Sequence, residues 1–153
     1  MTAYLTLRPE PWREATAARM VELILAHGMQ GRTIINLFTG CRKAVEEVAT
    51  RLPGLVYCNT LFPDVPLTRK LIDESAADGY RIICLCRAMI DTVTPELVAY
   101  AADKGIRVWD WGVQNEAEAA AAIARGISGF QMCSRSVASS VIDGILAHLP
   151  ENP

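Results

Sequence analysis

The chain has 153 residues, of which 51% are apolar and 21% charged, and its formal net charge is −2. This length and composition predict a single globular domain with one core, spanning residues 1–153. Fifteen Lys and Arg residues stand against seventeen Asp and Glu residues without any basic run. That balance excludes the positive surface on which nucleic-acid binding depends, so we expect no nucleic-acid partner.

The apolar runs, such as IICLC and MVELILAH, are much shorter than the roughly 18 residues of a membrane span. The first residues, MTAYLTLRPEPW, lack the basic and then apolar regions of a secretory signal. The number of cysteines is odd and no CxxC pair occurs, which favours reduced thiols. We therefore expect a cytoplasmic protein without a membrane span. The cysteines are Cys41, Cys58, Cys84, Cys86 and Cys133.

Six short apolar runs, rich in β-branched and aromatic residues, alternate with longer helical patterns, as is typical of βα units in a parallel sheet. We expect strands at 3–8, 33–38, 54–59, 81–86, 106–111 and 128–133. Helices are predicted at 12–27, 42–51, 67–78, 95–103, 116–125 and 137–148. Six consecutive units favour an α/β array like a TIM barrel, incomplete or closed by oligomerisation, over a doubly wound sheet, although both folds share the pattern.

Residues at the expected helix ends support these boundaries. A cation before a glycine suits a helix that ends in a left-handed residue, as in His27–Gly28, Lys104–Gly105 and Arg125–Gly126. Capping side chains and acidic residues suit helix starts, as in Thr94-Pro95-Glu96 and Asn115-Glu116.

In such a barrel, the functional face is formed by the C-terminal ends of the strands. His27 and His148 fall at helix C-termini, on the opposite face, so we expect neither to act as a general base or a metal ligand. Four arginines follow strands, where their guanidinium groups could hold a phosphate or carboxylate, or could be ordinary surface residues. They are Arg8, Arg42, Arg87 and Arg135. Ser134-Arg135-Ser136 opens the last expected helix, and its hydroxyls and backbone N–H groups suit a phosphate.

Carboxylates on this face are few, whereas a divalent cation needs two or three that converge. They are Glu10, Asp64, Asp91 and Asp110. Asp110 alternates with Trp109 and Trp111, so if the tryptophans point into the barrel, Asp110 faces the helices as an ion-pair partner or helix cap. The cysteines near strand ends, Cys41, Cys58, Cys86 and Cys133, are expected to be buried and unreactive without an activating histidine.

The segment TPELVAYAADKGIRVWDWGVQNEAEAAAAIARGISGF resembles the C-terminal part of glycerophosphodiester phosphodiesterases, a TIM-barrel family. Trp111-Gly112-Val113-Gln114 takes the place of the family's Trp-Thr-Val-Asn, and Gly126-Ile127-Ser128-Gly129 that of Gly-Val-Asp-Gly. LTLRPE resembles its Glu-Ile-Lys strand, and IINLF its strand ending in Ser-Phe. The resemblance covers nearly the whole chain, as strands three to eight of the barrel, and retains Trp111, Phe38 and the charge of Arg8. It adds Trp111 to the candidate ligand-binding residues.

The departures fall on the catalytic positions of that family. Thr6 stands where the family has a metal-binding glutamate, Leu37 replaces the serine, Gln114 the asparagine, and Met132-Cys133 the final Thr-Asp. The His-Arg-Gly and Glu-x-Asp strands have no counterpart. The resemblance therefore implies that the catalytic histidines and the calcium or magnesium ligands are missing, so we expect no cofactor and no catalytic residue.

Two functions remain as alternatives. In the first, the chain is an inactive or incomplete phosphodiesterase-like domain that binds a small phosphorylated ligand or serves as an interaction module. In the second, it is an active metal-dependent phosphodiesterase whose missing site comes from another chain. A truncated or mis-started product is a third possibility. Because a barrel of eight strands needs about 250 residues, six strands would expose two edges, which predicts a homo-oligomer, most simply a dimer.

Overall fold

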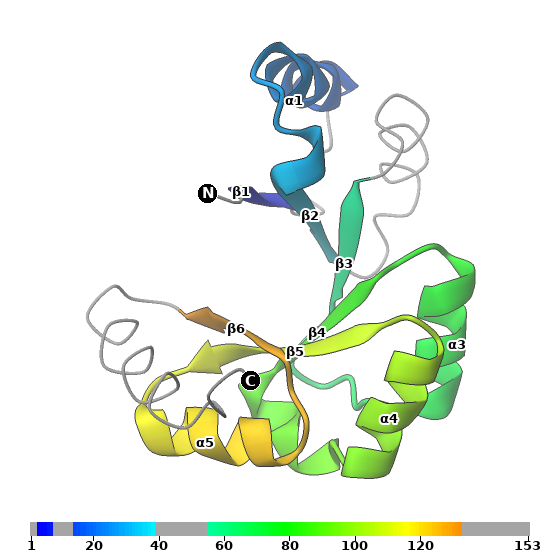
Figure 1. Cartoon of the computed structure of the whole chain (residues 1–153), viewed down its shortest axis with the longest axis vertical. Coiled ribbons are helices and arrows are strands. Elements are labelled where there is room, and N and C mark those ends of the chain that lie inside the picture. The colour runs from blue at the N-terminus through cyan, green and yellow to red at the C-terminus, as the bar shows by residue number, and fades with distance from the viewer. Residues whose placement is uncertain (1–2, 8–13, 39–54, 133–153) are drawn as a thin grey trace, which may run out of the picture.

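A computed structural model describes residues 3–7, 14–38 and 55–132 of the chain. Six strands form one parallel sheet whose spatial order equals their order in the sequence. The sheet curls with helices on its outside, so the predicted incomplete TIM-barrel-like array is confirmed (Figure 1). The strands are β1 (Ala3–Leu7), β2 (Thr33–Phe38), β3 (Val56–Thr60), β4 (Ile82–Cys86), β5 (Arg107–Val113) and β6 (Gly129–Met132).

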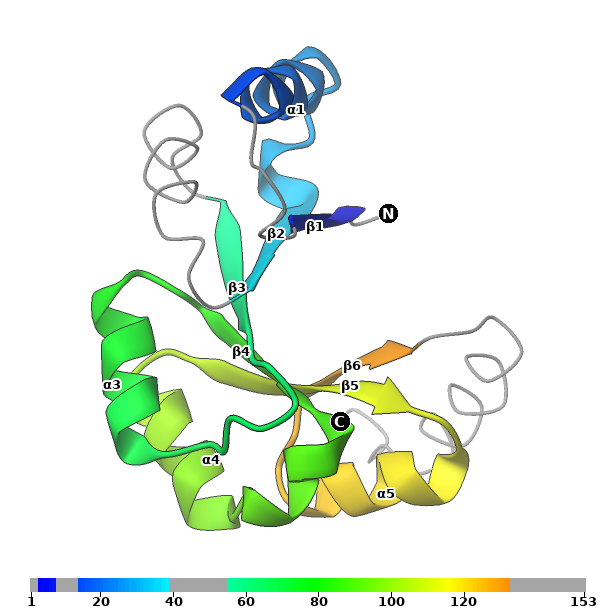
Figure 2. The same ribbon diagram turned by 180° about the vertical axis from the view of Figure 1, so that it is seen from behind.

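Helices follow the strands and lie on the outside of the curled sheet (Figure 2). Every predicted strand and helix in the described part of the chain is present, with ends within two residues of those expected. The expected helices at 42–51 and 137–148 lie outside that part. Two short 3-10 helices were not predicted. The α-helices are α1 (Glu14–Ala26), α3 (Arg69–Ala77), α4 (Pro95–Asp103) and α5 (Glu116–Ala124), and the 3-10 helices are η1 (Gln30–Arg32) and η2 (Arg87–Thr92).

The main core lies between the sheet and these helices. Ile83 and Val108 of the sheet are packed in one cluster with Ile72 of α3, Ala101 of α4 and Ala122 of α5. The opposite side of the sheet, here called the inner side, has a second cluster. Burial on both sides explains why the strands are apolar through most of their length. The inner cluster consists of Cys58, Ile82 and Cys84, with Ile34, Val56, Trp109 and Trp111 packed against them.

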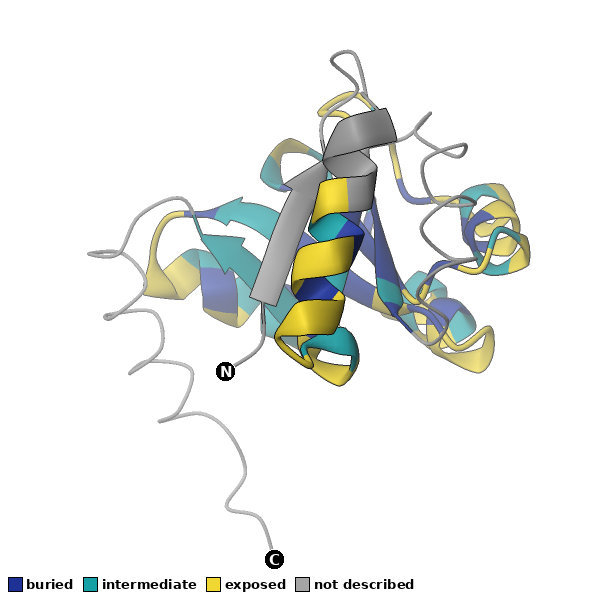
Figure 3. Ribbon diagram, turned by 90° about the horizontal axis from the view of Figure 1, so that it is seen from above, coloured by how far each residue is buried: buried dark blue, intermediate teal, exposed yellow. Residues whose placement is uncertain are grey.

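The burial pattern also shows which face of α1 packs inward. Val21 and Ile24 are buried, whereas Leu23 and Leu25 are 44% and 46% exposed. Buried and exposed residues therefore alternate along the helix at helical spacing (Figure 3).

No helix in the described ranges has the length and apolar character needed to cross a membrane. The expected dimer stays a prediction.

A β-bulge interrupts β5 at Gly112. Trp111 pairs with Gln131 and Val113 pairs with Met132, so Gly112 is an extra residue between two successive pairs. Its φ of +99° is a conformation that glycine adopts readily and side-chain-bearing residues rarely do. Because of the extra residue, Val113 packs against Ala119 of α5, although it lies two positions beyond the inner-facing Trp111.

The predicted helix ends are confirmed. Thr94 accepts a hydrogen bond from the backbone N of Leu97 at 3.3 Å, and Asn115 accepts one from the N of Glu118 at 3.0 Å. At the other ends, the glycines after α1, α4 and α5 all have positive φ. Short-range signals therefore determine where these helices begin and end. The three glycines are Gly28, Gly105 and Gly126.

Replacing Thr94 with alanine is expected to lower the free energy of unfolding by about 1 kcal/mol, because the N of Leu97 loses its side-chain acceptor. Urea denaturation followed by circular dichroism measures this loss. Thr94→Ser keeps the hydroxyl and is the matched control, which we expect to retain most of the stability. Equal losses for the two variants would contradict the capping role.

Candidate functional site

The structure describes two of the seven predicted ligand-binding residues, Arg87 and Trp111. They lie at the C-terminal ends of adjacent strands, since Cys86, which precedes Arg87, is paired with Trp111 in the sheet. Arg87 points to the helix side and Trp111 to the inner side. The two residues are therefore neighbours in the fold but do not face one common site. The other five, Arg8, Arg42, Ser134, Arg135 and Ser136, lie outside the described residues.

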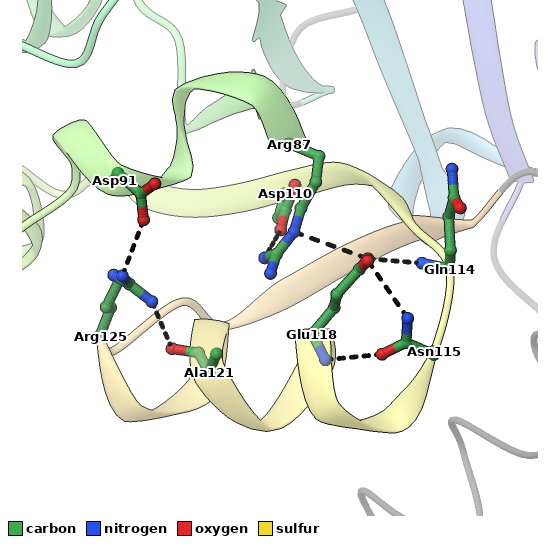
Figure 4. Close-up of polar contacts among 8 residues, drawn as sticks. All are labelled: Arg87, Asp91, Asp110, Gln114, Asn115, Glu118, Ala121 and Arg125. Atoms are coloured by element: carbon green, nitrogen blue, oxygen red, sulfur yellow. Dashed lines mark hydrogen bonds and ion pairs between the residues drawn. The ribbon is translucent and has the colours of Figure 1, made fainter.

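Arg87 lies between two carboxylates on the helix side (Figure 4). Its Nη1 is 2.9 Å from Oδ2 of Asp110, and its Nε is 3.6 Å from Oε2 of Glu118. Asp110 is fully buried, which confirms the prediction that it faces the helices and forms a structural ion pair. Arg87 is thus already paired with carboxylates of the protein, and its predicted contact with an anionic ligand stays a prediction.

Glu118 also fixes the turn between β5 and α5. Its Oε2 accepts a hydrogen bond from the backbone N of Gln114 at 2.9 Å, and its Oε1 accepts one from Nδ2 of Asn115 at 3.2 Å. Glu118 was not among the residues predicted from the sequence. The signal was present, because Asn115 and Glu118 have the spacing of a capping box, in which the cap and the third helical residue bond reciprocally.

A second ion pair links the same two helices. Nη2 of Arg125, which caps the end of α5, lies 3.0 Å from Oδ1 of Asp91 in η2 (Figure 4). The candidate carboxylates therefore do not converge: Asp91 pairs with Arg125, Asp110 with Arg87, and Asp64 is exposed in the connection after β3. Glu10 lies outside the described residues. Within them, no group of three His, Cys, Asp or Glu side chains could hold a metal ion.

The electrostatics of Asp110 are unusual because only one of its oxygens is satisfied. Oδ2 binds Arg87, whereas Oδ1 is buried and has no hydrogen-bond partner within residues 3–7, 14–38 and 55–132. Burial raises the pKa of this carboxyl above its ordinary value, Arg87 counteracts the rise, and the nearby charge of Glu118 adds to it. Burial therefore disfavours the charged form of Asp110.

The described residues on the inner side at the end of β5 are uncharged, and Trp111 is the aromatic one among them. Trp111 is half-buried, and its Nε1 is shielded from solvent and has no hydrogen-bond partner in the described part of the chain. Cys86 and Gln131 flank it in the sheet. One row below, the Cys84 thiol lies 4.0 Å from Oε1 of Gln131, and its hydrogen bond with Cys58 and its burial raise its pKa. Cys58, Cys84 and Cys86 are all buried, as predicted for Cys58 and Cys86.

The remaining predicted residues lie elsewhere. His27 directly follows the C-terminus of α1, as expected, and Cys41, Cys133 and His148 are outside the described residues. A surface cluster that the sequence did not predict joins α3 to α4: Tyr100 Oη donates to Oδ1 of Asp73 at 2.8 Å, and Nζ of Lys104 lies 3.1 Å from the same oxygen. These hydrogen bonds lower the pKa of Asp73.

Comparison with known proteins identifies the fold. No known protein-family model matches the chain, and no curated protein is similar to it in sequence. A solved structure from Silicibacter pomeroyi, provisionally named a glycerophosphoryl diester phosphodiesterase, has 25% identity and a TM-score of 0.68, covering 93% of this chain and 50% of its own. A provisionally named glycerophosphodiester phosphodiesterase from Galdieria sulphuraria has 16% identity and a TM-score of 0.78, covering 97% and 58%.

Barrels with other chemistry also match. The YdjI aldolase of Escherichia coli has 13% identity and a TM-score of 0.66, covering 94% of this chain and 62% of its own. The chain thus spans about half to three-fifths of the length of these structures. The fold is that of a glycerophosphodiester phosphodiesterase-like TIM barrel, while activity depends on the site rather than on the fold.

Proposed function

We propose that this chain, with its glycerophosphodiester phosphodiesterase-like barrel fold, is a non-catalytic module that binds a small phosphorylated ligand at the C-terminal ends of its strands. The observation that carries the proposal is the indole of Trp111. Its N–H is buried on the inner side and has no acceptor among the described residues. A phosphate oxygen that reaches this N–H on binding would accept its hydrogen bond, and the ring would cover the apolar part of the ligand.

The described part of this face suits binding better than hydrolysis. Calcium and magnesium, the ions of the resembled family, take hard oxygen ligands, mainly carboxylates. The inner side at this level instead offers the indole of Trp111, the thiol of Cys86 and the amide of Gln131. Asp110, the carboxylate next to Trp111 in the chain, points to the helix side and is paired with Arg87. The described residues therefore do not fit the metal of that family.

Positive charge for the ligand has to come from elsewhere, because Arg87 is balanced by two carboxylates. The proposal assigns this role to Arg8, Arg42 and Ser134-Arg135-Ser136, which follow strands in the sequence. A guanidinium and the N–H groups of a helix start are suited to phosphate. Arg87 is assigned a structural role on the helix side of the sheet, through its ion pairs with Asp110 and Glu118.

Isothermal titration calorimetry with glycerol 3-phosphate tests the proposal. We expect binding to the unmodified chain and about tenfold weaker binding to Trp111→Phe, which keeps the ring but removes the N–H that bonds a charged oxygen. Tyr100→Phe, which changes an aromatic residue on the helix surface, is the matched control and should leave the affinity unchanged.

A hydrolysis assay with glycerophosphocholine distinguishes the alternative. We expect no turnover with calcium or magnesium. Turnover that a chelator abolishes would overturn the non-catalytic assignment and favour an active phosphodiesterase completed by another chain. Absence of glycerol 3-phosphate binding, or equal affinity for the Trp111→Phe variant, would contradict the proposed site.

A further inference from the structure

Arg87, Asp110 and Glu118 join three elements, because Arg87 begins η2, Asp110 lies in β5 and Glu118 lies in the first turn of α5. Among the described residues, Arg87 is the one ion-pair partner of Asp110. The side chain of Arg87 thus connects η2 to the end of β5, next in sequence to Trp111 (Figure 4). Loss of this ion pair would therefore weaken the attachment of β5 to η2.

The charges in this group do not balance. Two carboxylates share one guanidinium, which leaves a net charge of −1 in a site where Asp110 is fully buried. The side chain of Glu118 is 29% exposed and accepts hydrogen bonds from Gln114 and Asn115. Asp110 is fully buried, and its Oδ1 has no hydrogen-bond partner among the described residues. Protonation of Asp110 therefore removes a buried charge from this group.

The surroundings of Asp110 favour its protonation and the loss of its ion pair with Arg87. Among the described residues, the charged groups that face it are Arg87 from η2 and Glu118 from α5, while the thiol of Cys84 in the adjacent strand lies on the inner side of the sheet. Its neighbours in the sheet register, Leu85 and Phe130, are apolar. The ion pair between Asp91 and Arg125 also joins η2 to α5 and does not depend on Asp110. The two helices thus stay linked when Arg87 leaves Asp110.

We propose that these three residues form an acid-responsive clamp: in mildly acidic solution Asp110 takes a proton from solvent, Arg87 pairs with Glu118 alone, and the end of β5 is released from η2. The change alters the surroundings of Trp111, which adjoins Asp110 in the chain. It requires no ligand, so it holds whatever this end of the barrel binds.

The direction of the pH effect follows from the raised pKa of Asp110. The native state binds this proton more readily than the unfolded chain, whose aspartates titrate near 3.8. The stability that Asp110 contributes is therefore fully present below the ordinary value and is lost as the pH rises through the native pKa. At neutral pH, burial of the ionised Asp110 therefore lowers the free energy of unfolding relative to that of the protonated form.

Two measurements test the clamp. Carbon-13 NMR of the aspartate carboxyl groups between pH 7 and 3 gives the titration of Asp110 directly, and tryptophan fluorescence over the same range reports on the end of β5. We expect Asp110 to titrate above the ordinary value of 3.8 and a fluorescence transition with the same midpoint. Asp110→Asn should abolish that transition. Asp73→Asn, which removes an exposed paired carboxylate, should leave it unchanged.

Titration of Asp110 at or below its ordinary value would overturn the proposal, as would a fluorescence transition that survives in Asp110→Asn. If Asp110→Asn does not fold, Glu118→Gln provides the test. Removing the neighbouring negative charge should lower the midpoint of Asp110, since Glu118 raises it. An unchanged midpoint would show that the two carboxylates do not share the guanidinium.

Discussion

Replacing Arg87 with methionine is expected to lower the free energy of unfolding by about 3–5 kcal/mol at pH 7, because it leaves a buried charge without its partner. Methionine fills much of the same space but cannot donate to Asp110, whose carboxylate is fully buried. Urea denaturation at pH 7 measures the loss. The result separates a structural role from a ligand-binding role, since a ligand-binding arginine could be removed at little cost in stability.

The pH dependence of this loss identifies its cause. As the pH falls, Asp110 takes up a proton and no longer needs the guanidinium, so the difference between Arg87→Met and the unmodified chain should shrink towards pH 4. Arg125→Met is the matched control: it breaks the pair with Asp91, which is 88% exposed, and should cost less than about 1 kcal/mol. Equal losses for the two variants, or a loss independent of pH, would contradict the prediction.

Replacing Gly129 with alanine is expected to lower the free energy of unfolding by about 1–3 kcal/mol through overpacking. A Cβ at this position would lie closer than 3.0 Å to three atoms of the Trp109 indole, which packs across the glycine from the adjacent strand. The ring must rotate or the strands must separate. Thermal denaturation gives the loss, and a shift in tryptophan emission shows that the indole has moved.

Two further variants control for this result. Gly31→Ala introduces a Cβ that meets no atom within 4 Å, so we expect little change. In a Trp109→Leu background, Gly129→Ala should cost less than it does alone, because the smaller side chain leaves room for the methyl group. A loss of equal size in both backgrounds would show that contact with the indole is not the cause.

Most of the fold could be predicted from the sequence because its signals are local. Strand and helix periods alternate along the chain, and residues such as Thr94 and Asn115 mark helix starts through hydrogen bonds to residues three positions away. The orientation of Asp110 also followed from a local rule, the alternation of side chains in a strand, together with its tryptophan neighbours. The six residues of η2 are too few to show a helical period, so this element was missed.

The site was harder to predict, because its contacts join distant parts of the chain. Arg87 and Asp110 are 23 residues apart, and only the register of β4 against β5 brings them together. A guanidinium beyond a strand end indicates an anion, but the sequence does not say whether that anion is a ligand or a carboxylate of the protein. The contact of Glu118 with Arg87 also joins distant parts of the chain. The sequence around Glu118 indicates only its local role in a helix cap, so this contact was not predicted.

The bulge at Gly112 has a consequence for alignment with other barrels. Without the extra residue, Trp111 and Val113 would follow each other in regular alternation and keep the orientations they have now. A related chain that lacks a residue at the position of Gly112 could therefore form the same sheet. A residue other than glycine at this position is disfavoured by the positive φ. In an alignment with a barrel that lacks the bulge, position-by-position equivalence holds only up to Trp111. Gln114 corresponds to the asparagine of Trp-Thr-Val-Asn only in chains that carry the same extra residue.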